Sequence, residues 1–460
     1  MKAQLGELAR AAGGRIVGPA DREITGVSTD TRTLGPGALF VAVKGESFDG
    51  HDFLAEAAAR GAAAALVARE PDPKLALPAI VVSDTVAALG ALAHAQRASF
   101  HGPVVAITGS NGKTTTKELC ARLLEAAGRR VRRTPGNLNN HIGLPLSILG
   151  LADGDEALVV ELGMNHAGEI DALARIADPT VGAITNVAPA HLGMLGSLEA
   201  IARAKGELFE RLRADATAIV NADDPNCVLQ SARFAGKKLR FGVRAQADFR
   251  ARNVRVEHGM PLYTLECPAG TAEIRMQSPG LHLVDDGLCA AAAAFASGAL
   301  GTRPLDAIRA GLEAFAGVPG RVALLRAPSG LLVVDDSYNA NPHSVARALE
   351  TLAELRGSGR AFAVLGDMFE LGDTEAALHA EVGRRAAAAG VALLVAVGPL
   401  SRHMADAARA AGVADVFTTD SAEAAAALVR AHAKTGDVVL IKASHGMKLE
   451  RVVKLLSESA

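Results

Sequence analysis

The sequence lacks an excess of charge of either sign. Its 460 residues include 48 Lys and Arg residues against 50 Asp and Glu residues. A chain with this balance produces no strong field that would attract nucleic acid or an anionic membrane. We therefore expect neither nucleic acid nor a lipid surface among its partners.

Cysteine and long apolar segments are also scarce. The four cysteines, at positions 120, 227, 267 and 289, match no zinc or disulfide spacing, which suits a reducing cytosol. The longest apolar stretch, around residues 288–300, is too short to span a bilayer, and the first residues lack the apolar core of a signal peptide. These absences predict a soluble, cytoplasmic protein, and the length predicts roughly two to four domains.

The clearest motif that is present is a loop between a predicted strand and a predicted helix. Residues 103–107 are apolar and β-branched, and residues 117–124 have apolar side chains at helical spacing. Between them lies Thr108-Gly109-Ser110-Asn111-Gly112-Lys113-Thr114-Thr115-Thr116. This loop is similar to the P-loop, except that Ile107 replaces the first glycine of the general pattern.

Each residue type in this loop suits the binding of phosphate. Backbone N–H groups at a helix N-terminus have no partner inside the helix, and the helix dipole favours an anion there. Gly109 and Gly112 allow the backbone to close around phosphates, Lys113 can reach the terminal ones, and the Thr114 hydroxyl is placed for Mg²⁺. The loop therefore predicts a nucleotide-phosphate site.

Further predicted strands of the central region end in polar side chains. Residues 158–160 lead to Glu161, residues 181–187 lead to a loop with His191, and residues 217–220 end in another polar loop. In an open parallel sheet, ligands bind outside the carboxyl ends of the strands. We therefore expect Glu161 and His191 to lie near the phosphates of a bound nucleotide.

Lys205 lies in a predicted helix over residues 198–212. Its neighbours at helical spacing are Ile201, Leu208 and Phe209, so that it shares a face with core residues. Taken alone, this position favours a lysine whose stem lies along the core and whose amine reaches water.

The pattern along the chain predicts an α/β fold in three domains. Residues 1–82 predict a small mixed α/β domain, and residues 83–318 predict a central P-loop-type, mostly parallel sheet with helices on both faces. Residues 319–460 predict a C-terminal Rossmann-like βαβ domain with strands at 331–335, 361–365, 391–397, 415–418 and 438–442. No G-x-G-x-x-G follows the first of these strands, so a dinucleotide site is unsupported.

Along essentially its whole length the sequence resembles the Mur ligase family of peptidoglycan synthesis. The family's ATP loop also lacks the first P-loop glycine, and further matching blocks lie at residues 137–145, 161–165, 190–192 and 204–207. The segment Asp335-Asp336-Ser337-Tyr338-Asn339-Ala340-Asn341-Pro342, together with residues 366–368 and 370–372, is similar to the family member that adds D-alanyl-D-alanine. The Asp-Asn-Pro-Arg motif of the diaminopimelate-adding member is missing.

The resemblance implies an activity, cofactors and partners. The three domains would bind, in order, a uridine nucleotide, ATP and the incoming amino substrate. The γ-phosphate of ATP would convert the terminal carboxylate of UDP-N-acetylmuramoyl-tripeptide into an acyl phosphate, which the amine of D-alanyl-D-alanine then attacks. The resemblance also implies two Mg²⁺ ions, a carbamylated Lys205 and a monomeric enzyme.

The resemblance implies a role for each residue that matches a family motif. The catalytic residues would be Lys113, Glu161, His191 and Lys205. Thr114 and Glu161 would bind one Mg²⁺, and Glu161, His191 and Lys205 the second. ATP would contact Gly109, Ser110, Asn111, Gly112, Lys113, Thr114, Thr115, Asp286, Arg321 and Asp336. The uridine substrate would contact Ser28, Asp30, Arg32, Lys44, Gly45, Asn139 and Asn140, and the dipeptide would contact Tyr338, Asn339 and Asn341.

Two departures from the family pattern concern the nucleotide site and the end of the chain. Asp286 stands where an asparagine often contacts the adenine. Ala443 and His445 stand where glycine and arginine are common. Base recognition by Asp286 and any role for residues 442–447 are therefore not implied.

Alternative functions remain open at this point. A P-loop switch GTPase should carry an Asn-Lys-x-Asp motif, which residues 221–224 do not match, and a non-catalytic scaffold would not need Glu161, His191 and Lys205 together. Another Mur-type ligase, adding diaminopimelate or lysine, is a closer rival. Folylpolyglutamate synthase is a further one, although it lacks a separate uridine-nucleotide domain. The third residue of the acceptor peptide stays open between lysine and diaminopimelate.

Overall fold

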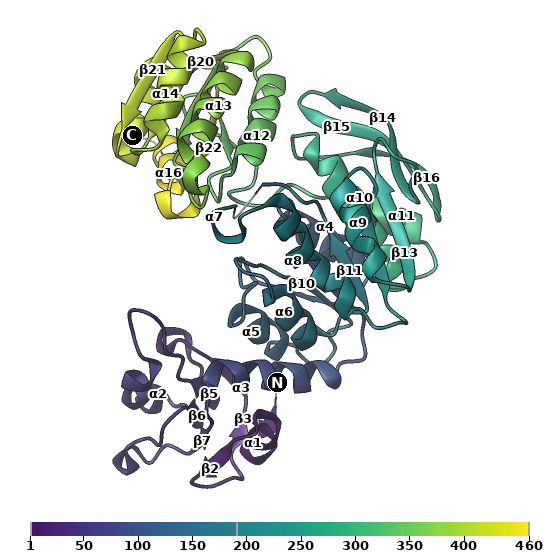
Figure 1. Ribbon diagram of the computed structural model, residues 1–460, viewed down its shortest axis with the longest axis vertical. Coiled ribbons are helices and arrows are strands. Elements are labelled where there is room, and N and C mark those ends of the chain that lie inside the picture. The colour runs from purple at the N-terminus through teal and green to yellow at the C-terminus, as the bar shows by residue number, and fades with distance from the viewer. Residues whose placement is uncertain (1, 190–191, 459–460) are drawn as a thin grey trace.

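The computed structural model describes residues 2–189 and 192–458. Figure 1 shows three α/β units stacked along the long axis, from the purple N-terminal unit at the bottom to the green and yellow C-terminal unit at the top. Each unit is built on its own sheet. The predicted fold class is confirmed.

The N-terminal unit is a five-stranded sheet with short helices. The strand order is β2-β7-β6-β5-β4, and β2 is antiparallel to its neighbour, whereas the others run parallel. A separate pair, β1 and β3, lies beside it. The elements are β1 (Ala3–Gln4), α1 (Leu5–Ala12), β2 (Arg15–Val17), β3 (Glu23–Ile24), β4 (Gly26–Ser28), β5 (Ala38–Val41), α2 (Leu54–Ala59), β6 (Ala64–Val67), β7 (Ala79–Val81) and α3 (Thr85–Ala98).

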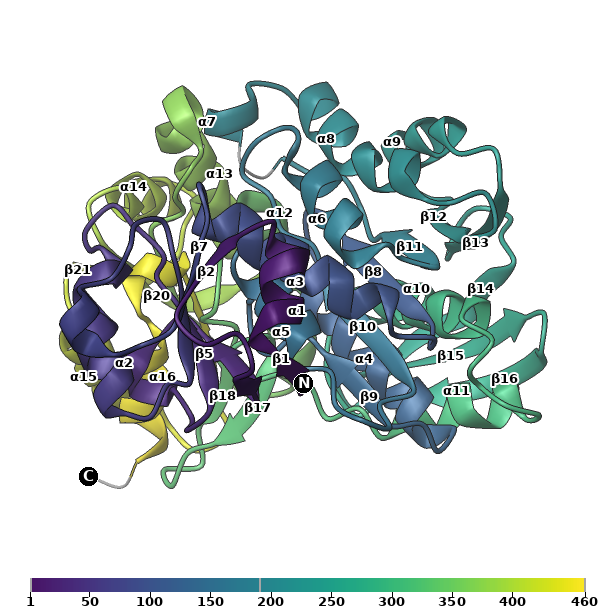
Figure 2. The same ribbon diagram turned by 90° about the horizontal axis from the view of Figure 1, so that it is seen from below.

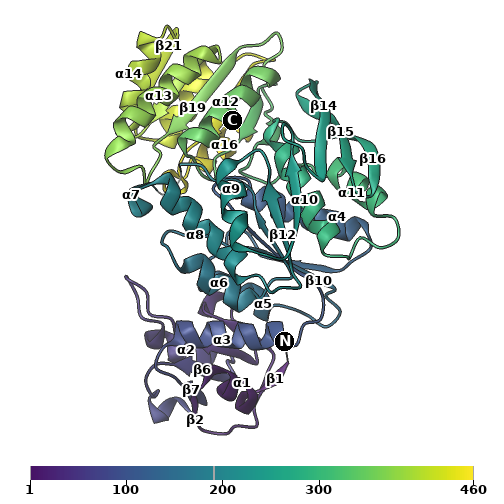
Figure 3. The ribbon, with the colours of Figure 1, turned by 45° about the vertical axis from the view of Figure 1, so that its right-hand side comes forward.

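The central unit is a nine-stranded sheet in the order β16-β15-β14-β13-β12-β11-β8-β10-β9. Strands β9 to β14 and β8 run parallel, and β15 and β16 are antiparallel additions at one edge (Figure 3). The elements are β8 (Val104–Thr108), α4 (Lys113–Ala126), β9 (Val131–Arg133), α5 (Gly143–Leu149), β10 (Ala157–Glu161), α6 (Glu169–Ala177), β11 (Val181–Ile184), α7 (Leu192–Leu195), α8 (Leu198–Arg211), β12 (Thr217–Asn221), α9 (Pro225–Gln230), β13 (Lys237–Gly242), β14 (Phe249–Glu257), β15 (Met260–Cys267), β16 (Gly270–Arg275), α10 (His282–Ala296) and α11 (Pro304–Glu313).

The apolar runs of the central strands are explained by burial on both faces of the sheet. Successive side chains of a strand point to opposite faces. In β8, Val104 and Ala106 join a core with α5, α6 and α8, whereas Val105 and Ile107 join a second core with α4, α10 and α11. A strand covered on both sides has no polar face, and it therefore reads as a continuous apolar segment.

Strand β8 lies where the chain changes direction across the sheet. Its neighbours are β10 on one side and β11 on the other, and the chain passes from β8 to β9 and β10 on one side before it crosses to β11. Ligand crevices form outside the carboxyl ends of strands at such a point. The loop at 109–112 follows β8, Thr185 follows β11, and Glu161 is the last residue of β10.

The C-terminal unit is a six-stranded sheet in the order β17-β18-β22-β19-β20-β21, in which β17 is antiparallel to β18 and the others run parallel. Helices cover both faces, with separate apolar cores on each. The elements are β17 (Ala323–Arg326), β18 (Leu332–Asp335), α12 (Pro342–Leu355), β19 (Ala361–Gly366), α13 (Glu375–Ala388), β20 (Val391–Val397), α14 (Ser401–Ala410), β21 (Asp415–Thr419), α15 (Ala422–His432), β22 (Val438–Lys442) and α16 (Glu450–Ser457).

Helix α3 joins the N-terminal unit to the central unit. It packs against α5 and α6 on the central side and against α1 on the other side (Figures 1 and 2). Near its end, the side chain of Arg97 is 7% exposed. Its guanidinium donates hydrogen bonds to the carbonyls of Ala177 (2.9 Å), Asp178 (2.7 Å) and Phe100 (3.0 Å). Arg97 therefore fastens α3 to the end of α6.

Among the described residues, no helix is long and apolar enough to cross a membrane.

We predict that Arg97→Met lowers the free energy of unfolding by about 2–4 kcal/mol, because buried carbonyls lose a charged donor. Arg60→Ala is the control, since its ion pair with Glu56 is exposed and should contribute less than about 0.5 kcal/mol. Urea unfolding monitored by circular dichroism measures both values. Equal losses in the two variants would contradict the role given to Arg97.

Candidate functional site

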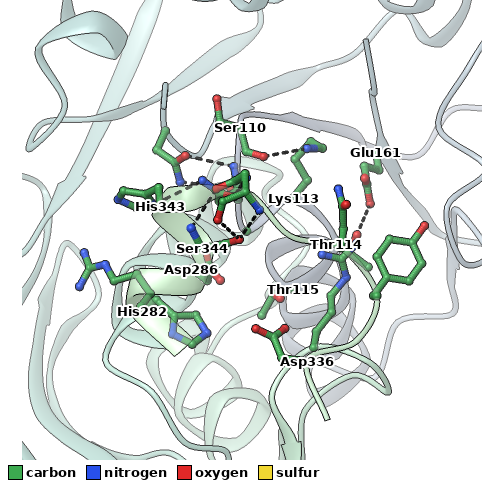
Figure 4. Close-up of a pocket in the computed structure, with 18 of the residues that line it drawn as sticks. Ser110, Lys113, Thr114, Thr115, Glu161, His282, Asp286, Asp336, His343 and Ser344 are labelled. Atoms are coloured by element: carbon green, nitrogen blue, oxygen red, sulfur yellow. Dashed lines mark hydrogen bonds between the residues drawn. The ribbon is translucent and has the colours of Figure 1, made fainter. Parts of the chain in front are cut away.

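A cavity of about 310 Å³ lies between the carboxyl edge of the central sheet and the C-terminal unit (Figure 4). The central unit contributes the loop after β8 and the end of β10, and the C-terminal unit contributes the loop after β18 and the start of α12. The cavity brings together these predicted site residues: Ser110, Asn111, Gly112, Lys113, Thr114, Thr115, Asn139, Glu161, Lys205, Asp286, Arg321, Asp336, Tyr338, Asn339 and Asn341.

Glycine is required at two positions of the loop that precedes α4. Gly109 and Gly112 have φ values of +148° and +79°, which other residues rarely adopt. A Cβ on Gly109 would lie 1.9 Å from the Thr185 hydroxyl oxygen, and one on Gly112 would lie 2.1 Å from the Asp286 carboxylate. The loop is therefore packed tightly against its surroundings.

Lys113 lies at the first position of α4 and bends back over the loop. Its Nζ donates hydrogen bonds to the carbonyls of Gly109 (2.9 Å) and Ser110 (3.3 Å). Burial lowers the pKa of Lys113, and the nearby Glu161 carboxylate opposes this shift. The amine is thus held beside the backbone groups that would surround a phosphate.

The loop is also fixed from the neighbouring strand. The Thr185 hydroxyl donates to the Asn111 carbonyl (2.6 Å), and the Asn186 side chain both donates to that carbonyl (3.1 Å) and accepts from the Asn111 N–H (3.1 Å). The pattern predicted a strand to residue 187, but β11 ends at Ile184, which is paired with the last residue of β8. The side chains of the next two residues bind the loop.

Glu161 is the buried carboxylate of the site, with 1% of its surface exposed. Its Oε2 accepts a hydrogen bond from the Thr114 hydroxyl (2.7 Å), and its Oε1 accepts one from the Asn139 amide (2.8 Å). Figure 4 shows Thr114 and Glu161 pointing toward each other. Carboxylate and hydroxyl oxygens are donors that suit Mg²⁺, so this pair fits the predicted metal site.

The two other predicted metal ligands are Lys205 and His191, and only Lys205 lies among the described residues. Lys205, on α8, is 2% exposed and lines the same cavity. Burial, with a smaller contribution from Lys113, lowers its pKa well below the ordinary value. His191 lies outside the described residues. Within 2–189 and 192–458, no three His, Cys, Asp or Glu side chains form a metal-holding group.

The C-terminal side of the cavity is organised by adjacent aspartates. Asp335 accepts hydrogen bonds from Ser337 and from the Gly320 N–H, and thereby shapes its own loop. Asp336 instead pairs with Lys442, whose Nζ lies 2.6 Å from its carboxylate and also donates to the Asn339 carbonyl (2.8 Å). Burial raises the pKa of Asp336, and Lys442 opposes this shift.

Two aromatic rings lie over the start of the C-terminal unit. The Arg321 guanidinium lies 4.3 Å from the centre of the Tyr338 ring, a cation–π contact. The centre of the His445 ring lies 5.0 Å from the centre of the Tyr338 ring. His445 therefore has a packing role beside a predicted site residue, although the family resemblance implied no role for it.

Hydrogen bonds of Asn111 join the phosphate-binding loop directly to the C-terminal unit. The Asn341 amide donates to the Asn111 side-chain oxygen across 2.8 Å. The Asn341 oxygen meanwhile accepts from the Ser344 N–H and caps α12. Nearby, a ring nitrogen of His343 lies 3.5 Å from the Asn111 amide. Asn341 therefore couples the start of α12 to the loop that would hold phosphates.

Asp285 and Asp286 form an acidic pair under the loop. Asp286 is 5% exposed and lies near the Thr116 hydroxyl, which donates to it across 3.4 Å. Burial raises the pKa of Asp285 to about 6 and that of Asp286 well above its ordinary value. An aspartic acid that keeps its proton can donate as well as accept, which is also what an asparagine amide does.

The residues predicted for the uridine substrate do not all gather in one place. Ser28 and Asp30 line a second cavity of about 460 Å³, which Leu146 of the central unit also borders. Asp30 forms an ion pair with Arg32 through two hydrogen bonds, and this pair lowers the pKa of Asp30 to about 2. Lys44 and Gly45 belong to a small hairpin closed by Asp49 and Phe48.

The two predicted asparagines lie elsewhere. Asn139 contacts Glu161 in the first cavity, and Asn140 accepts hydrogen bonds from the Ile142 and Gly143 N–H groups at the start of α5. Neither lines the cavity of Ser28 and Asp30.

Several residues of the first cavity were missed by the sequence analysis. They are Asn137, Asn186, His282, Asp285, His343, Arg347 and Lys442. His343 and Arg347 are four residues apart on α12, and such spacing places both on one face of the helix. That spacing was a usable signal, but nothing in the sequence indicates which face of α12 meets the central unit.

Comparisons with known proteins agree with this arrangement. Three family models match the chain: the Mur ligase family catalytic domain over residues 23–97, the Mur ligase middle domain over 107–294 and the Mur ligase glutamate ligase domain over 320–445. A UDP-N-acetylmuramoyl-tripeptide–D-alanyl-D-alanine ligase of Escherichia coli is 39% identical, covering 99% of this chain and 98% of its own. The chain belongs to the Mur ligase family.

Solved structures extend the comparison to the particular branch. A crystal structure of MurF from Acinetobacter baumannii superposes with a TM-score of 0.88 at 32% identity, covering 100% of this chain and 99% of that one. MurF ligase from Thermotoga maritima, solved in complex with ADP, gives a TM-score of 0.82 at 31% identity, covering 94% and 97%. The fold is thus shared with ligases of this branch from end to end.

We predict that Gly112→Ala weakens the binding of ADP by at least about tenfold, which corresponds to 1.4 kcal/mol. The new Cβ would clash with Asp286, so either the loop or the aspartate must move. Gly128→Ala is the matched control, because Gly128 has φ +80° but no atom within 4 Å of a new Cβ. Calorimetric titration with ADP should show near-normal affinity in the control, and equal affinity in both variants would refute the prediction.

Proposed function

We propose that this protein is an ATP-dependent ligase that joins D-alanyl-D-alanine to the terminal carboxylate of a UDP-N-acetylmuramoyl-tripeptide. The observation that carries the proposal is that the phosphate-binding loop and the Asp335–Asn341 loop face each other across one cavity. An acyl phosphate formed at the first loop would therefore meet an amine held by the second. The name of the Escherichia coli relative supports this substrate pair.

Each part of the chain has a proposed role in this reaction. Residues 1–82 bind the uridine nucleotide through Ser28 and Asp30 at their cavity, through Arg32, which is paired with Asp30, and through Lys44 and Gly45 of the small hairpin. Residues 83–318 bind ATP, and residues 319–460 bind the dipeptide and cover the nucleotide. Every proposed contact comes from one chain, so we propose a monomer. ATP and a UDP-linked substrate are consistent with a reaction in the cytoplasm.

The first step is transfer of the γ-phosphoryl group of ATP to the tripeptide carboxylate, which yields an acyl phosphate and ADP. The N–H groups of the 109–112 loop and the Lys113 amine stabilise the negative charge of the phosphates. Asp286 lies directly under this loop. We propose that Asp286 contacts the nucleotide in a protonated form and so replaces the asparagine of the family.

Thr114 and Glu161 would hold one Mg²⁺ ion, as their paired oxygens suggest. When bound, Mg²⁺ neutralises charge on the phosphoryl oxygens. We propose that Glu161, His191 and Lys205 hold a second ion, with Lys205 present as a carbamate. Burial favours the neutral amine of Lys205, and a neutral amine is the form that reacts with CO₂. The carbamate then offers carboxylate-like oxygens.

The second step is attack of the dipeptide amine on the acyl carbon, followed by release of phosphate from the tetrahedral intermediate. Tyr338, Asn339 and Asn341 are proposed to hold the dipeptide, since all three line the cavity from the C-terminal side. Arg321, held over Tyr338, adds positive charge at this boundary. Closure of the two units around the cavity keeps water from the acyl phosphate.

The substrate assignment is tested by phosphate release with ATP, each candidate nucleotide tripeptide and D-alanyl-D-alanine. Turnover should require all three substrates and Mg²⁺, and comparing lysine with diaminopimelate at the third position would identify the acceptor. Turnover with a dipeptide acceptor plus diaminopimelate or lysine, or with a folate plus glutamate, would favour the rival ligases instead.

We predict that Lys113→Ala reduces turnover by about two orders of magnitude or more, because a positive charge on the β- and γ-phosphates is lost. Steady-state kinetics with saturating substrates measures this effect. Lys74→Ala, at an exposed position of the N-terminal unit, is the control and should keep normal turnover. Near-normal activity in the Lys113 variant would contradict the assignment of the 109–112 loop as the site that binds the phosphates of ATP.

We predict that Lys205→Ala loses most activity and recovers part of it in acetate, because a small carboxylate can take the place of the carbamate oxygens. Mass spectrometry of the wild-type protein under CO₂ should also detect a gain of one carboxyl group at Lys205. Full activity without acetate, or an unmodified lysine in a fully active enzyme, would rule out the carbamate.

A further inference from the structure

Lys117 is a buried lysine that the proposed reaction does not use. It lies one turn after Lys113 on α4, and its surface is 0% exposed. Its Nζ donates to the carbonyls of Thr134 (2.7 Å) and Gly136 (3.3 Å) and lies 3.0 Å from the Glu118 carboxylate. An ammonium has three donors, and three acceptors surround this one. Lys117 is therefore not available to a phosphate.

The acceptors of Lys117 begin the segment that carries Asn139. Thr134 is buried, but residues 135–138 and 140 are exposed, and Leu138 keeps 39% of its surface in solvent. Apolar packing cannot hold such a segment in place. Polar contacts hold it instead. At its start, Lys117 binds the Thr134 and Gly136 carbonyls, and the Thr134 N–H donates to the Val159 carbonyl (3.1 Å). At its end, the Gly163 N–H donates to the Asn139 carbonyl (2.8 Å), and the Asn140 side chain accepts from N–H groups at the start of α5.

The same segment reaches Glu161 by two routes. The Thr134 hydroxyl oxygen accepts a hydrogen bond from the Glu161 N–H (3.1 Å), and the Asn139 amide donates to the Glu161 carboxylate (2.8 Å). Besides Thr114 of α4, two groups that orient Glu161 thus belong to a segment whose first carbonyls bind Lys117. Groups that orient a metal ligand affect metal binding even though they do not touch the ion.

We propose that Lys117 is a positioning residue that fixes the 134–140 segment and, through Thr134 and Asn139, the carboxylate of Glu161. This inference rests on the proposed function in that Glu161 is taken as a Mg²⁺ ligand. The cation links α4, which begins at the phosphate-binding loop, to the orientation of the metal ligand. The buried charge of Lys117 thereby fixes the position of the metal ligand relative to the phosphate-binding loop.

An ammonium suits this place because no neutral side chain supplies three donors from one atom. Without the ammonium, the Thr134 and Gly136 carbonyls would lose their donor. Glu118 balances the charge and is itself paired with Arg133 on β9. The ion pair therefore remains compensated within this corner of the structure.

The experiment compares Lys117→Met with Arg97→Met, which also removes a buried cation that binds backbone carbonyls, but far from Glu161. Hydrogen exchange reports the order of residues 134–140, and calorimetry reports ADP binding with Mg²⁺ or with EDTA. In Lys117→Met we expect exchange of this segment to rise about tenfold and the Mg²⁺-dependent gain in ADP affinity to fall about tenfold or more. ADP affinity in EDTA should change less than about twofold, and Arg97→Met should show neither effect.

Lys117→Gln keeps a neutral amide with two N–H donors and serves if the methionine variant does not fold. Combining Lys117→Gln with Asn139→Ala should weaken Mg²⁺-dependent binding by less than the sum of the two single losses, because both act through Glu161. Additive losses, or wild-type exchange and Mg²⁺ dependence in Lys117→Met, would overturn the proposal. These readouts need no peptide substrate, so failure of the proposed ligase reaction would not be mistaken for failure of this inference.

Discussion

The site depends on orienting a carboxylate that is almost completely buried. Glu161 ends a strand that is buried on both faces, and it retains 1% of its surface. A charge in such a place is costly unless donors surround it. Thr114 and Asn139 supply these donors, one from the first turn of α4 and one from a loop. Satisfying one buried group therefore brings together three separate segments of the chain.

The same requirement explains how the C-terminal unit is attached to the site. Lys442 ends β22 and is 3% exposed, and it is paired with Asp336 at the end of the neighbouring strand. The pair lines the cavity opposite the phosphate-binding loop, where Asn341 reaches across to Asn111. Each unit thus presents a compensated charge at its strand ends. The cavity is formed where these two edges meet.

Local sequence patterns predicted the strands that are buried on both faces of a sheet. The features that these patterns did not predict depend on short edge strands or on contacts between residues distant in the sequence. Strands β8, β10 and β18 were found from their apolar runs. Strands β9 and β17 were not predicted, because they are only three and four residues long and lie at or near sheet edges. Strand β9 (Val131–Arg133) is also rich in arginine and has no apolar pattern. Strand β11 ends beside the last residue of β8, and the side chain of Asn186 beyond it binds Asn111, some 75 residues away in the sequence.

The candidate site was predictable to a similar degree. The phosphate-binding loop and Glu161 follow from strand ends and glycine chemistry, whereas the C-terminal loop was assigned from family resemblance. Asn139 was likewise assigned to the uridine substrate from the resemblance, and its side chain contacts Glu161 in the first cavity rather than lining the cavity of Ser28. The presence of His343 and Arg347 in the cavity depends on which face of α12 packs toward the central unit, and the periodicity of the sequence does not indicate that face.

The cavity also concentrates ionisable groups whose burial favours their neutral forms. The pKa values of Lys113 and Lys205 are lowered, and those of Asp286 and Asp336 are raised. A nucleotide polyanion and a divalent cation would change the electrostatic potential at all four groups at once. Ligand binding is then linked to the uptake or release of protons. Heats of nucleotide binding would accordingly include the ionisation heat of the buffer, and nucleotide affinity would follow pH even in the absence of any reaction.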